Sequence, residues 1–453
     1  MVVFIPSPKN IRAISARLHT RLGDFWWYSL MMFLACRAAD VLNAFVGLWL
    51  VPKYVDPSEL GAVKPLTDFA AFLAVPIAVF ANTFRNEMTL LATNREFGRL
   101  KSLMQGVFVS VAIFIVLALA TAKWTFPLFL ERIRIPAGSL AMLVIASSFL
   151  GAVSPIYNNA LQALKKFKTS TIINLAGAPL RILVMLVAMP FRALSGYFLG
   201  QCAPYAFTIG ACVFGLKKEL AVPAEPYWNR ETIRRFTGTL AIFALWALTG
   251  GTCTLIESLV LRQRLPDLDS AGYYMATRFS DISTYLYMTL AFAMFPFSAE
   301  IAKKGGDIRP LVLKATAASF AFCAVSATTF LLIGRPILAL LPHGTQYAEY
   351  WWAIPCLIGI SAIGTLPGLY TTAEISAGRF GFLKWLMPIE IIYPTLLLIV
   401  TGYGYFKALM PADWIEFLHF HNICALDTML WWMTAGQLAR LVCCCIAMRK
   451  KRQ

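Results

Sequence analysis

The segment SLMQGVFVSVAIFIVLALATA, residues 102–122, decides the class of this protein. It is 21 residues long and carries no charged side chain. A helix rises about 1.5 Å per residue, so a helix of this length spans about 30 Å, the thickness of the hydrocarbon core of a bilayer. The segment therefore predicts a transmembrane helix.

Similar apolar runs recur along nearly the whole chain of 453 residues, which is 59% hydrophobic and 14% charged, with a mean hydropathy of +0.67. A soluble protein of this length could not bury so much apolar surface. Lipid permits only helices or closed barrels, and these continuous runs lack the alternation of barrel strands. We therefore predict an all-α polytopic membrane protein with about twelve transmembrane helices. The expected spans are 27–52, 62–84, 102–122, 138–160, 170–189, 193–215, 238–261, 271–298, 311–334, 349–375, 383–402 and 427–448.

Basic residues predict the orientation of these spans, because cytoplasmic segments of membrane proteins are enriched in Lys and Arg. Of the 40 Lys and Arg residues, 26 lie in alternate segments that include both termini, 10 lie in the opposite segments and 4 lie within spans. Both the basic N-terminal segment 1–26 and the basic tail 449–453 are therefore expected in the cytoplasm. This bias and the attraction of basic loops to anionic membrane lipids account for most of the net charge of +17, so no nucleic-acid partner is required.

The chain divides into two predicted lobes of six spans, 27–215 and 238–448, joined by a polar cytoplasmic linker, 216–237. The second and eighth spans are similar, since a glycine opens each one and a basic residue and an aspartate follow. These residues are Gly61, Lys64 and Asp68 in the second span, and Gly272, Arg278 and Asp281 in the eighth. Parallel repeats of this kind typically enclose a central cavity whose exposure alternates between the two sides of the membrane.

Ionisable residues within the spans mark the candidate site, because charged groups in a membrane usually face a protein interior or a water-filled cavity. Two interpretations apply to the basic residues and aspartates. They form neutral pairs that lock helices together, or the basic residues bind an anion such as a pyrophosphate while the acids orient them. The candidate basic residues are Arg37, Lys64, Arg181 and Arg278, and the aspartates are Asp40, Asp68 and Asp281.

Glu257 and Glu374 form a second set, because neither has a basic neighbour on its own predicted helix. A lone intramembrane carboxylate is a candidate for coupling to H⁺ or Na⁺. The alternative is a carboxyl group near a helix end that reaches water. Arg440 lies closer to the cytoplasmic end of the last span and is interpreted as a side chain that snorkels to the interface.

Enzymatic chemistry is not expected, because the sequence shows no nucleophile–base arrangement, phosphate-binding loop or metal-ligand cluster. Most of the ten cysteines lie in apolar spans, where cysteine acts as a small apolar residue, and their spacing suggests no disulfide framework. No cofactor is expected apart from a coupling ion.

Three short stretches resemble known transporters. They are Tyr54–Gly61 (YVDPSELG), Ala271–Arg278 (AGYYMATR) and Phe295–Glu300 (FPFSAE). They are similar to helix junctions of the polysaccharide transport family. This family belongs to the MOP exporter superfamily, together with the O-antigen (Wzx-type) flippases, the lipid II flippases and the MATE multidrug exporters.

This resemblance implies a V-shaped pair of six-helix lobes in a bacterial inner membrane. It implies transfer of an undecaprenyl-pyrophosphate-linked oligosaccharide for O-antigen or exopolysaccharide synthesis, alongside polymerase and glycosyltransferase machinery. The basic residues of lipid II flippases lie on helices one, two and eight, which here carry Arg37, Lys64 and Arg278. The coupling carboxylates of MATE exporters lie on helices one, seven and ten, which here carry Asp40, Glu257 and Glu374. The basic set favours an anionic lipid-linked substrate, and a cation-coupled multidrug antiporter is the alternative.

Overall fold

The computed structural model describes residues 39–135, 140–400 and 425–450, and these residues form an all-helical protein. Residues 39–45 are helical and continue into η1 (Val46–Leu50), α2 (Val51–Tyr54) and α3 (Pro57–Leu60). The first lobe then contains α4 (Val63–Thr93), α5 (Phe97–Arg132), α6 (Leu140–Ala163), α7 (Phe167–Ala188) and α8 (Ala193–Gly215). After η2 (Glu219–Ala221), the second lobe contains α9 (Arg230–Arg264), α10 (Asp267–Lys303), α11 (Arg309–Ala339), α12 (Gly344–Tyr347), η3 (Ala348–Trp352), α13 (Ala353–Ser376), α14 (Leu383–Val400) and α16 (Leu426–Lys450).

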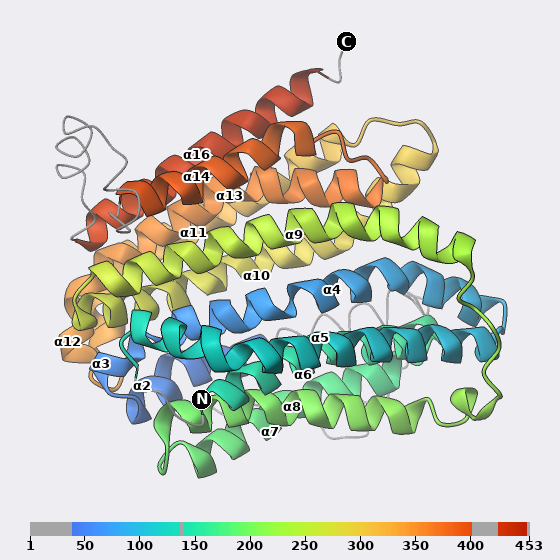
Figure 1. Ribbon diagram of the computed structural model, residues 1–453. Coiled ribbons are helices and arrows are strands. Elements are labelled where there is room, and N and C mark those ends of the chain that lie inside the picture. Colours follow the sequence, from blue (N-terminus) through green and yellow to red (C-terminus); the bar gives the residue numbers. More distant parts are fainter. Residues whose placement is uncertain (1–38, 136–139, 401–424, 451–453) are drawn as a thin grey trace, which may run out of the picture.

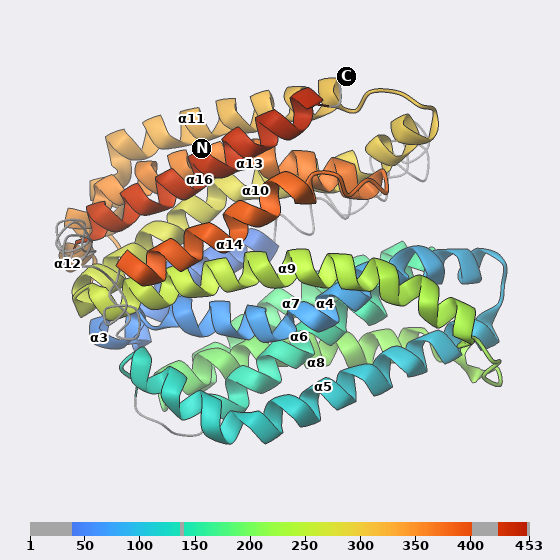
Figure 2. The same ribbon diagram turned by 45° about the horizontal axis from the view of Figure 1, so that its top comes forward.

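The long helices form two bundles that run roughly side by side (Figures 1 and 2). Helices α4 to α8 make up the first lobe, and α9 to α16 make up the second. Helix α9 packs on both α4 and α14, so it lies along the boundary between the lobes. The structure is thus a multi-pass membrane protein with the predicted two-lobe architecture.

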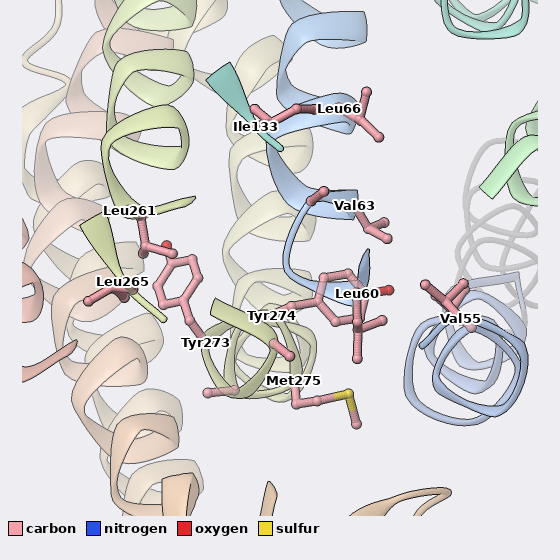
Figure 3. Close-up of a cluster of buried hydrophobic side chains, with 14 of the residues drawn as sticks. Val55, Leu60, Val63, Leu66, Ile133, Leu261, Leu265, Tyr273, Tyr274 and Met275 are labelled. Atoms are coloured by element: carbon pink, nitrogen blue, oxygen red, sulfur yellow. The ribbon is translucent and has the colours of Figure 1, made fainter. Parts of the chain in front are cut away.

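Buried apolar side chains form three cores, and their distribution defines the relation between the lobes. One core contains side chains of both lobes, including Leu60 and Leu66 from the first and Leu261, Tyr273 and Tyr274 from the second (Figure 3). The other two cores lie toward the opposite end of the helices, and the buried members of each come from one lobe. The lobes therefore share an apolar core at the end that carries α3 and have separate cores at the other end, which is the arrangement of a V.

The shared core depends on a close approach at Gly61, the last residue of the sequence stretch Tyr54–Gly61. A Cβ atom at this position would lie 2.5 Å from the Cβ atom of Ser270 on α10. Any larger residue would force the α3–α4 junction away from α10. The glycine that opens the second span thus allows contact between the lobes.

Arg262 clamps the two lobes at this end of the molecule. It lies in the last turn of α9 and is 1% exposed. Its Nε and Nη2 atoms donate to the first-lobe carbonyl oxygens of Ile133 and Ser58, at 3.1 and 2.8 Å, and its Nη1 atom lies 2.8 Å from the Asp267 carboxylate. Arg134 of the first lobe contacts the same carboxylate at 3.2 Å. The buried guanidinium thus has partners on both lobes, as a buried charge requires.

The linker is fixed to the first lobe. The hydroxyl group of Tyr227 donates to Glu87 at 2.8 Å, and the Nε1 atom of Trp228 donates to the carbonyl oxygen of Ser102 at 3.1 Å. Asn229 then caps α9, because its side chain accepts a hydrogen bond from the backbone of Thr232. Helix α9 therefore begins at Arg230, within the predicted linker.

Nine helical segments in the described part of the chain are long and apolar enough to cross a membrane. The expected spans outside this set are 27–52, 271–298 and 383–402. The first lies partly in residues 1–38, outside the described residues, the second is helical throughout within α10, and the third runs past residue 400. Several helices are longer than their spans. For example, α4 continues through residues 85–93, which were expected to be a loop. Apolar residues mark the part of a helix that lies in lipid, but they do not mark the residue at which the helix ends.

The Arg262 clamp generates a prediction. In Arg262→Met, the carbonyl oxygens of Ile133 and Ser58 lose a charged donor, so the shared end should open more often. We expect amide hydrogen exchange in residues 55–62 and 265–271 to be at least about tenfold faster than in the wild type. The control is Arg264→Met, which removes a charge from the same turn of α9. Equal exchange in Arg262→Met and the wild type would contradict the clamp.

Candidate functional site

The structure describes all but one of the predicted site residues. Arg37 lies in residues 1–38, outside the described residues, and Asp40 is half-buried on the helical segment that follows. The other basic and acidic candidates lie on five helices of both lobes. Lys64 and Asp68 are on α4, Arg181 on α7, Glu257 on α9, Arg278 and Asp281 on α10, and Glu374 on α13.

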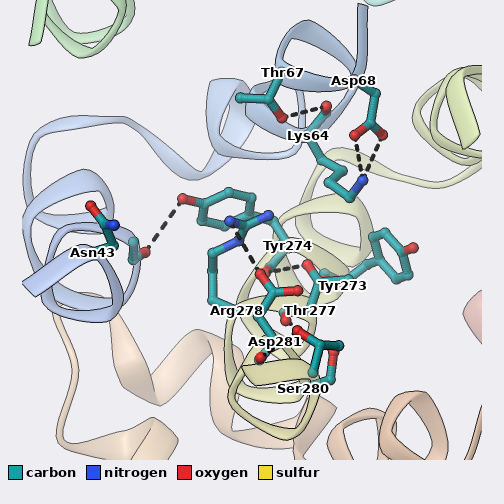
Figure 4. A network of polar contacts seen from close by, with 12 residues as sticks. Asn43, Lys64, Thr67, Asp68, Tyr273, Tyr274, Thr277, Arg278, Ser280 and Asp281 are labelled. Atoms are coloured by element: carbon teal, nitrogen blue, oxygen red, sulfur yellow. Dashed lines mark hydrogen bonds and ion pairs between the residues drawn. The ribbon is translucent and has the colours of Figure 1, made fainter. Parts of the chain in front are cut away.

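The basic residue and the aspartate of the second and eighth spans form an ion pair in each case. The Nζ atom of Lys64 lies 2.6 Å from the Asp68 carboxylate, and the Nη1 atom of Arg278 lies 3.2 Å from that of Asp281. Each pair lies within a single helix, so neither ion pair joins two helices. The four side chains extend into the same region between α4 and α10 (Figure 4), and Asp281 is within electrostatic range of both Lys64 and Asp68.

Arg278 lies across the boundary between the lobes. A Cβ atom on Gly47 of the first lobe would lie 2.9 Å from the Cδ atom of Arg278, so a glycine is needed for the arginine to pass. The guanidinium lies 5.2 Å from the centre of the Tyr274 ring, a cation–π geometry, and the Tyr274 hydroxyl donates to the carbonyl oxygen of Gly47 at 3.4 Å. The Nε atom of Arg278 is buried and has no hydrogen-bond partner among the described residues.

Arg181 is the least neutralised of the candidate cations that the structure describes. Its Nη1 atom donates to the side-chain oxygen of Asn43 at 2.6 Å, and its guanidinium lies 5.9 Å from the centre of the Tyr197 ring. Its Nε atom, like that of Arg278, is buried and has no hydrogen-bond partner in the part of the chain that the structure describes. No carboxylate of the described residues forms an ion pair with Arg181, so its positive charge is available to a ligand.

The second lobe contains a charged cluster that the sequence analysis missed. The Nη2 atom of Arg440 lies 2.7 Å from the Glu390 carboxylate and 3.1 Å from the Sγ atom of Cys253. The side chains of Arg440 and Glu390 are only 15% and 7% exposed. The prediction that Arg440 snorkels to the interface is therefore wrong, because a buried partner on α14 holds it inside the lobe. The sequence signal for this pair was an acidic residue, Glu390, and a basic residue, Arg440, in the last two predicted spans.

Glu257 and Glu374 lie in different surroundings. Glu257 is half-buried, and the Cys253 thiol lies 4.0 Å from its carboxylate. It is within electrostatic range of Arg440 on one side and of the Lys64–Asp68 pair on the other. Glu374 is 1% exposed and lies near Tyr370, in the separate core of the second lobe. The two glutamates are therefore not parts of one cluster.

Comparisons with known proteins agree with the observed fold. No protein-family model and no curated protein sequence matches the chain. A MATE-family multidrug resistance transporter of the MOP superfamily, solved in an inward-facing conformation, is similar with a TM-score of 0.64 and 13% identity, over 91% of this chain and 94% of that one. The lipid II flippase MurJ in an inward closed conformation is similar with a TM-score of 0.61 and 12% identity, over 93% of this chain and 87% of that one.

A third similar structure is a MOP superfamily transporter from Pyrococcus furiosus, described as having a binding pocket of reverse polarity. Its TM-score is 0.59 at 12% identity, over 93% of this chain and 94% of that one. At these identities the likeness establishes the fold. The chain has the MATE/MOP-like transporter fold over nearly its whole length.

The buried Arg440–Glu390 pair generates a second prediction. Arg440→Leu leaves the Glu390 carboxylate buried without its cation, which typically costs about 3–5 kcal/mol of unfolding free energy. The double variant Arg440→Leu with Glu390→Leu removes both charges and should recover most of that stability. Unfolding of the purified proteins in detergent measures both effects. A single variant as stable as the wild type, or a double variant less stable than the single one, would contradict this account.

Proposed function

We propose that this protein is a flippase that moves an undecaprenyl-pyrophosphate-linked oligosaccharide across the bacterial inner membrane for polysaccharide synthesis. The observation that carries the proposal is the set of cations where the lobes meet. Arg181 and Arg278 each hold a buried Nε donor without a hydrogen-bond partner among the described residues. The Nε atom of Arg440 is also without such a partner, but the guanidinium of Arg440 is paired with the buried Glu390. Buried unsatisfied donors are costly, and the oxygens of a pyrophosphate are acceptors suited to guanidinium groups.

The aspartates that pair with the basic residues still allow the basic residues to bind an anion. Asp68 and Asp281 each pair with a cation on their own helix, at an (i, i+4) or (i, i+3) spacing. They therefore hold Lys64 and Arg278 in place without occupying all the donors of Arg278. Together with Arg181, which forms no ion pair with a described residue, the basic groups present hydrogen-bond donors from both lobes to one ligand.

The V shape supports transport by alternating access. In the orientation proposed from the basic loops, with both termini in the cytoplasm, the shared core and the Arg262 clamp face the outside. The separate cores then face the cytoplasm, from which a lipid-linked substrate enters. In this mechanism the pyrophosphate reaches the basic groups while the prenyl chain stays in lipid. The lobes then separate at the Arg262 clamp and close at the cytoplasmic end.

A cation-coupled multidrug antiporter is the second candidate, and Glu257 is compatible with it. This carboxylate is half-buried between the charged pairs of the two lobes and has no ion-pair partner among the described residues. On either candidate it is the proposed coupling group for H⁺ or Na⁺. The basic set argues against the antiporter, because Arg181 and Arg278 would repel an organic cation.

The flippase proposal is tested by the surface glycan of a strain that lacks this protein. We expect wild-type complementation to restore the glycan and Arg278→Ala to reduce export at least about tenfold, because the pyrophosphate loses a charge-assisted donor. Arg278→Lys retains the charge and should keep part of the activity. Lys314→Ala, which removes an exposed cation from α11, is the control.

Immunoblots of the membrane fraction ensure that all variants are compared at equal levels. Full export by Arg278→Ala would contradict the role of the basic set. A deletion strain with intact surface glycan and increased sensitivity to cationic dyes would replace the flippase with the multidrug antiporter.

A further inference from the structure

The first lobe contains a pocket that the basic set does not account for. It is a cavity of about 380 Å³ between α4, α6 and α8. This volume lies within the usual range of small-molecule sites. Its polar and aromatic lining includes Thr67, Ser147, Ser148, Phe198, Gln201 and Tyr205.

Small residues keep this pocket open. The α4 wall contains Ala70, Ala71 and Ala74, and the α6 wall contains Gly151. A Cβ atom on Gly151 would lie 3.1 Å from the ring of Tyr205 on α8, so even an alanine there would press on the aromatic wall. The pocket is thus a space between two walls of small side chains and one wall with aromatic rings.

The chemistry of the lining favours an uncharged, hydroxyl-rich ligand. Among the described residues, the lining contains no carboxylate and no basic side chain. The hydroxyl groups of Ser147 and Ser148 donate to backbone carbonyl oxygens, at 2.8 and 2.6 Å, whereas the amide of Gln201 makes no hydrogen bond with the described residues. An organic cation would lack a counter-charge here, while a sugar ring presents hydroxyl groups to an amide and an apolar face to aromatic rings.

The pocket adjoins the cationic set. Thr67 precedes Asp68 in the sequence, and its hydroxyl group donates to the carbonyl oxygen of Lys64 at 2.8 Å. On the opposite wall, Tyr205 is within electrostatic range of Arg181. A ligand with a pyrophosphate at the basic groups would therefore bring the group attached to that pyrophosphate to the mouth of this pocket.

We propose that this pocket binds the sugar attached to the pyrophosphate and that this sugar is uncharged. The proposal rests on the proposed flippase function and extends it, because it names the chemical class of the first sugar. The negative charge of the substrate stays at Arg181 and Arg278. The sugar occupies the space beside Gln201 and Tyr205.

Binding to the purified protein in lipid nanodiscs tests this proposal. The probes are farnesyl pyrophosphate and the same molecule extended by N-acetylglucosamine, with Kd measured by titration calorimetry. We expect the sugar to tighten binding about tenfold in the wild type. Ala71→Phe fills the pocket and should abolish this difference while leaving the Kd of farnesyl pyrophosphate unchanged.

Two further variants complete the test. Gln201→Leu keeps the volume of the side chain but removes its donors and acceptor, so it should reduce the contribution of the sugar. Ala206→Phe adds the same bulk as Ala71→Phe at an exposed position of α8 outside the pocket lining, and it should bind both probes as the wild type does.

The outcomes separate the two proposals. If the wild type binds both probes equally, the sugar pocket is wrong and the flippase proposal stands. If neither probe binds, the flippase proposal itself fails, and the pocket proposal fails with it. Binding of tetraphenylphosphonium that Ala71→Phe abolishes would overturn the sugar pocket, because it would assign the cavity to organic cations.

Discussion

The structure depends on one constraint, which is that each ionisable group inside the membrane must find its partner within the protein. Arg262 meets this requirement with two carbonyl oxygens and a carboxylate, and Arg440 meets it in part, with a carboxylate and a thiol. The Nε atoms of Arg181, Arg278 and Arg440 are all buried without a hydrogen-bond partner among the described residues. Arg440 nevertheless has a buried carboxylate partner on another helix, Glu390, whereas Arg181 forms no ion pair with a described residue, so the ion-pair partner and not the Nε atom alone distinguishes these cations.

The same constraint explains why the two ends of the molecule differ. At the shared end, apolar side chains of both lobes pack together, and the Arg262 guanidinium satisfies carbonyl oxygens that the helix ends leave free. At the other end each lobe completes its own core. Opening the shared end therefore requires the lobes to give up the hydrogen bonds of the clamp and the apolar contacts of the shared core, whereas the two separate cores are not part of this contact.

The sequence predicts the helices well, but not the contacts between distant segments. Hydropathy locates the spans, and neutral pairing is one of two interpretations of the basic residues and aspartates; the Lys64–Asp68 and Arg278–Asp281 pairs form because partners three or four residues apart share a helix face. The Arg440–Glu390 pair joins residues 50 positions apart on different helices, so no local pattern reveals it. The burial of Arg262 is equally hidden, since two of its partners are backbone carbonyls, which carry no signature in the sequence.

The position of Glu257 relates the two charged sets to each other. The Lys64–Asp68 pair belongs to the first lobe and the Arg440–Glu390 pair to the second, and Glu257 is within electrostatic range of both pairs along the α4–α9 contact. In a medium of low dielectric constant, a change of one charge at this carboxylate acts strongly on both neighbours. Loss of its negative charge would weaken the attraction of Lys64 toward the second lobe. It would also remove the attraction between Glu257 and Arg440, so that Arg440 would keep only its ion pair with Glu390. In the coupling role proposed above, a single protonation or cation-binding event at Glu257 would change the forces on both lobes at once, whereas Glu374 is enclosed in the core of the second lobe.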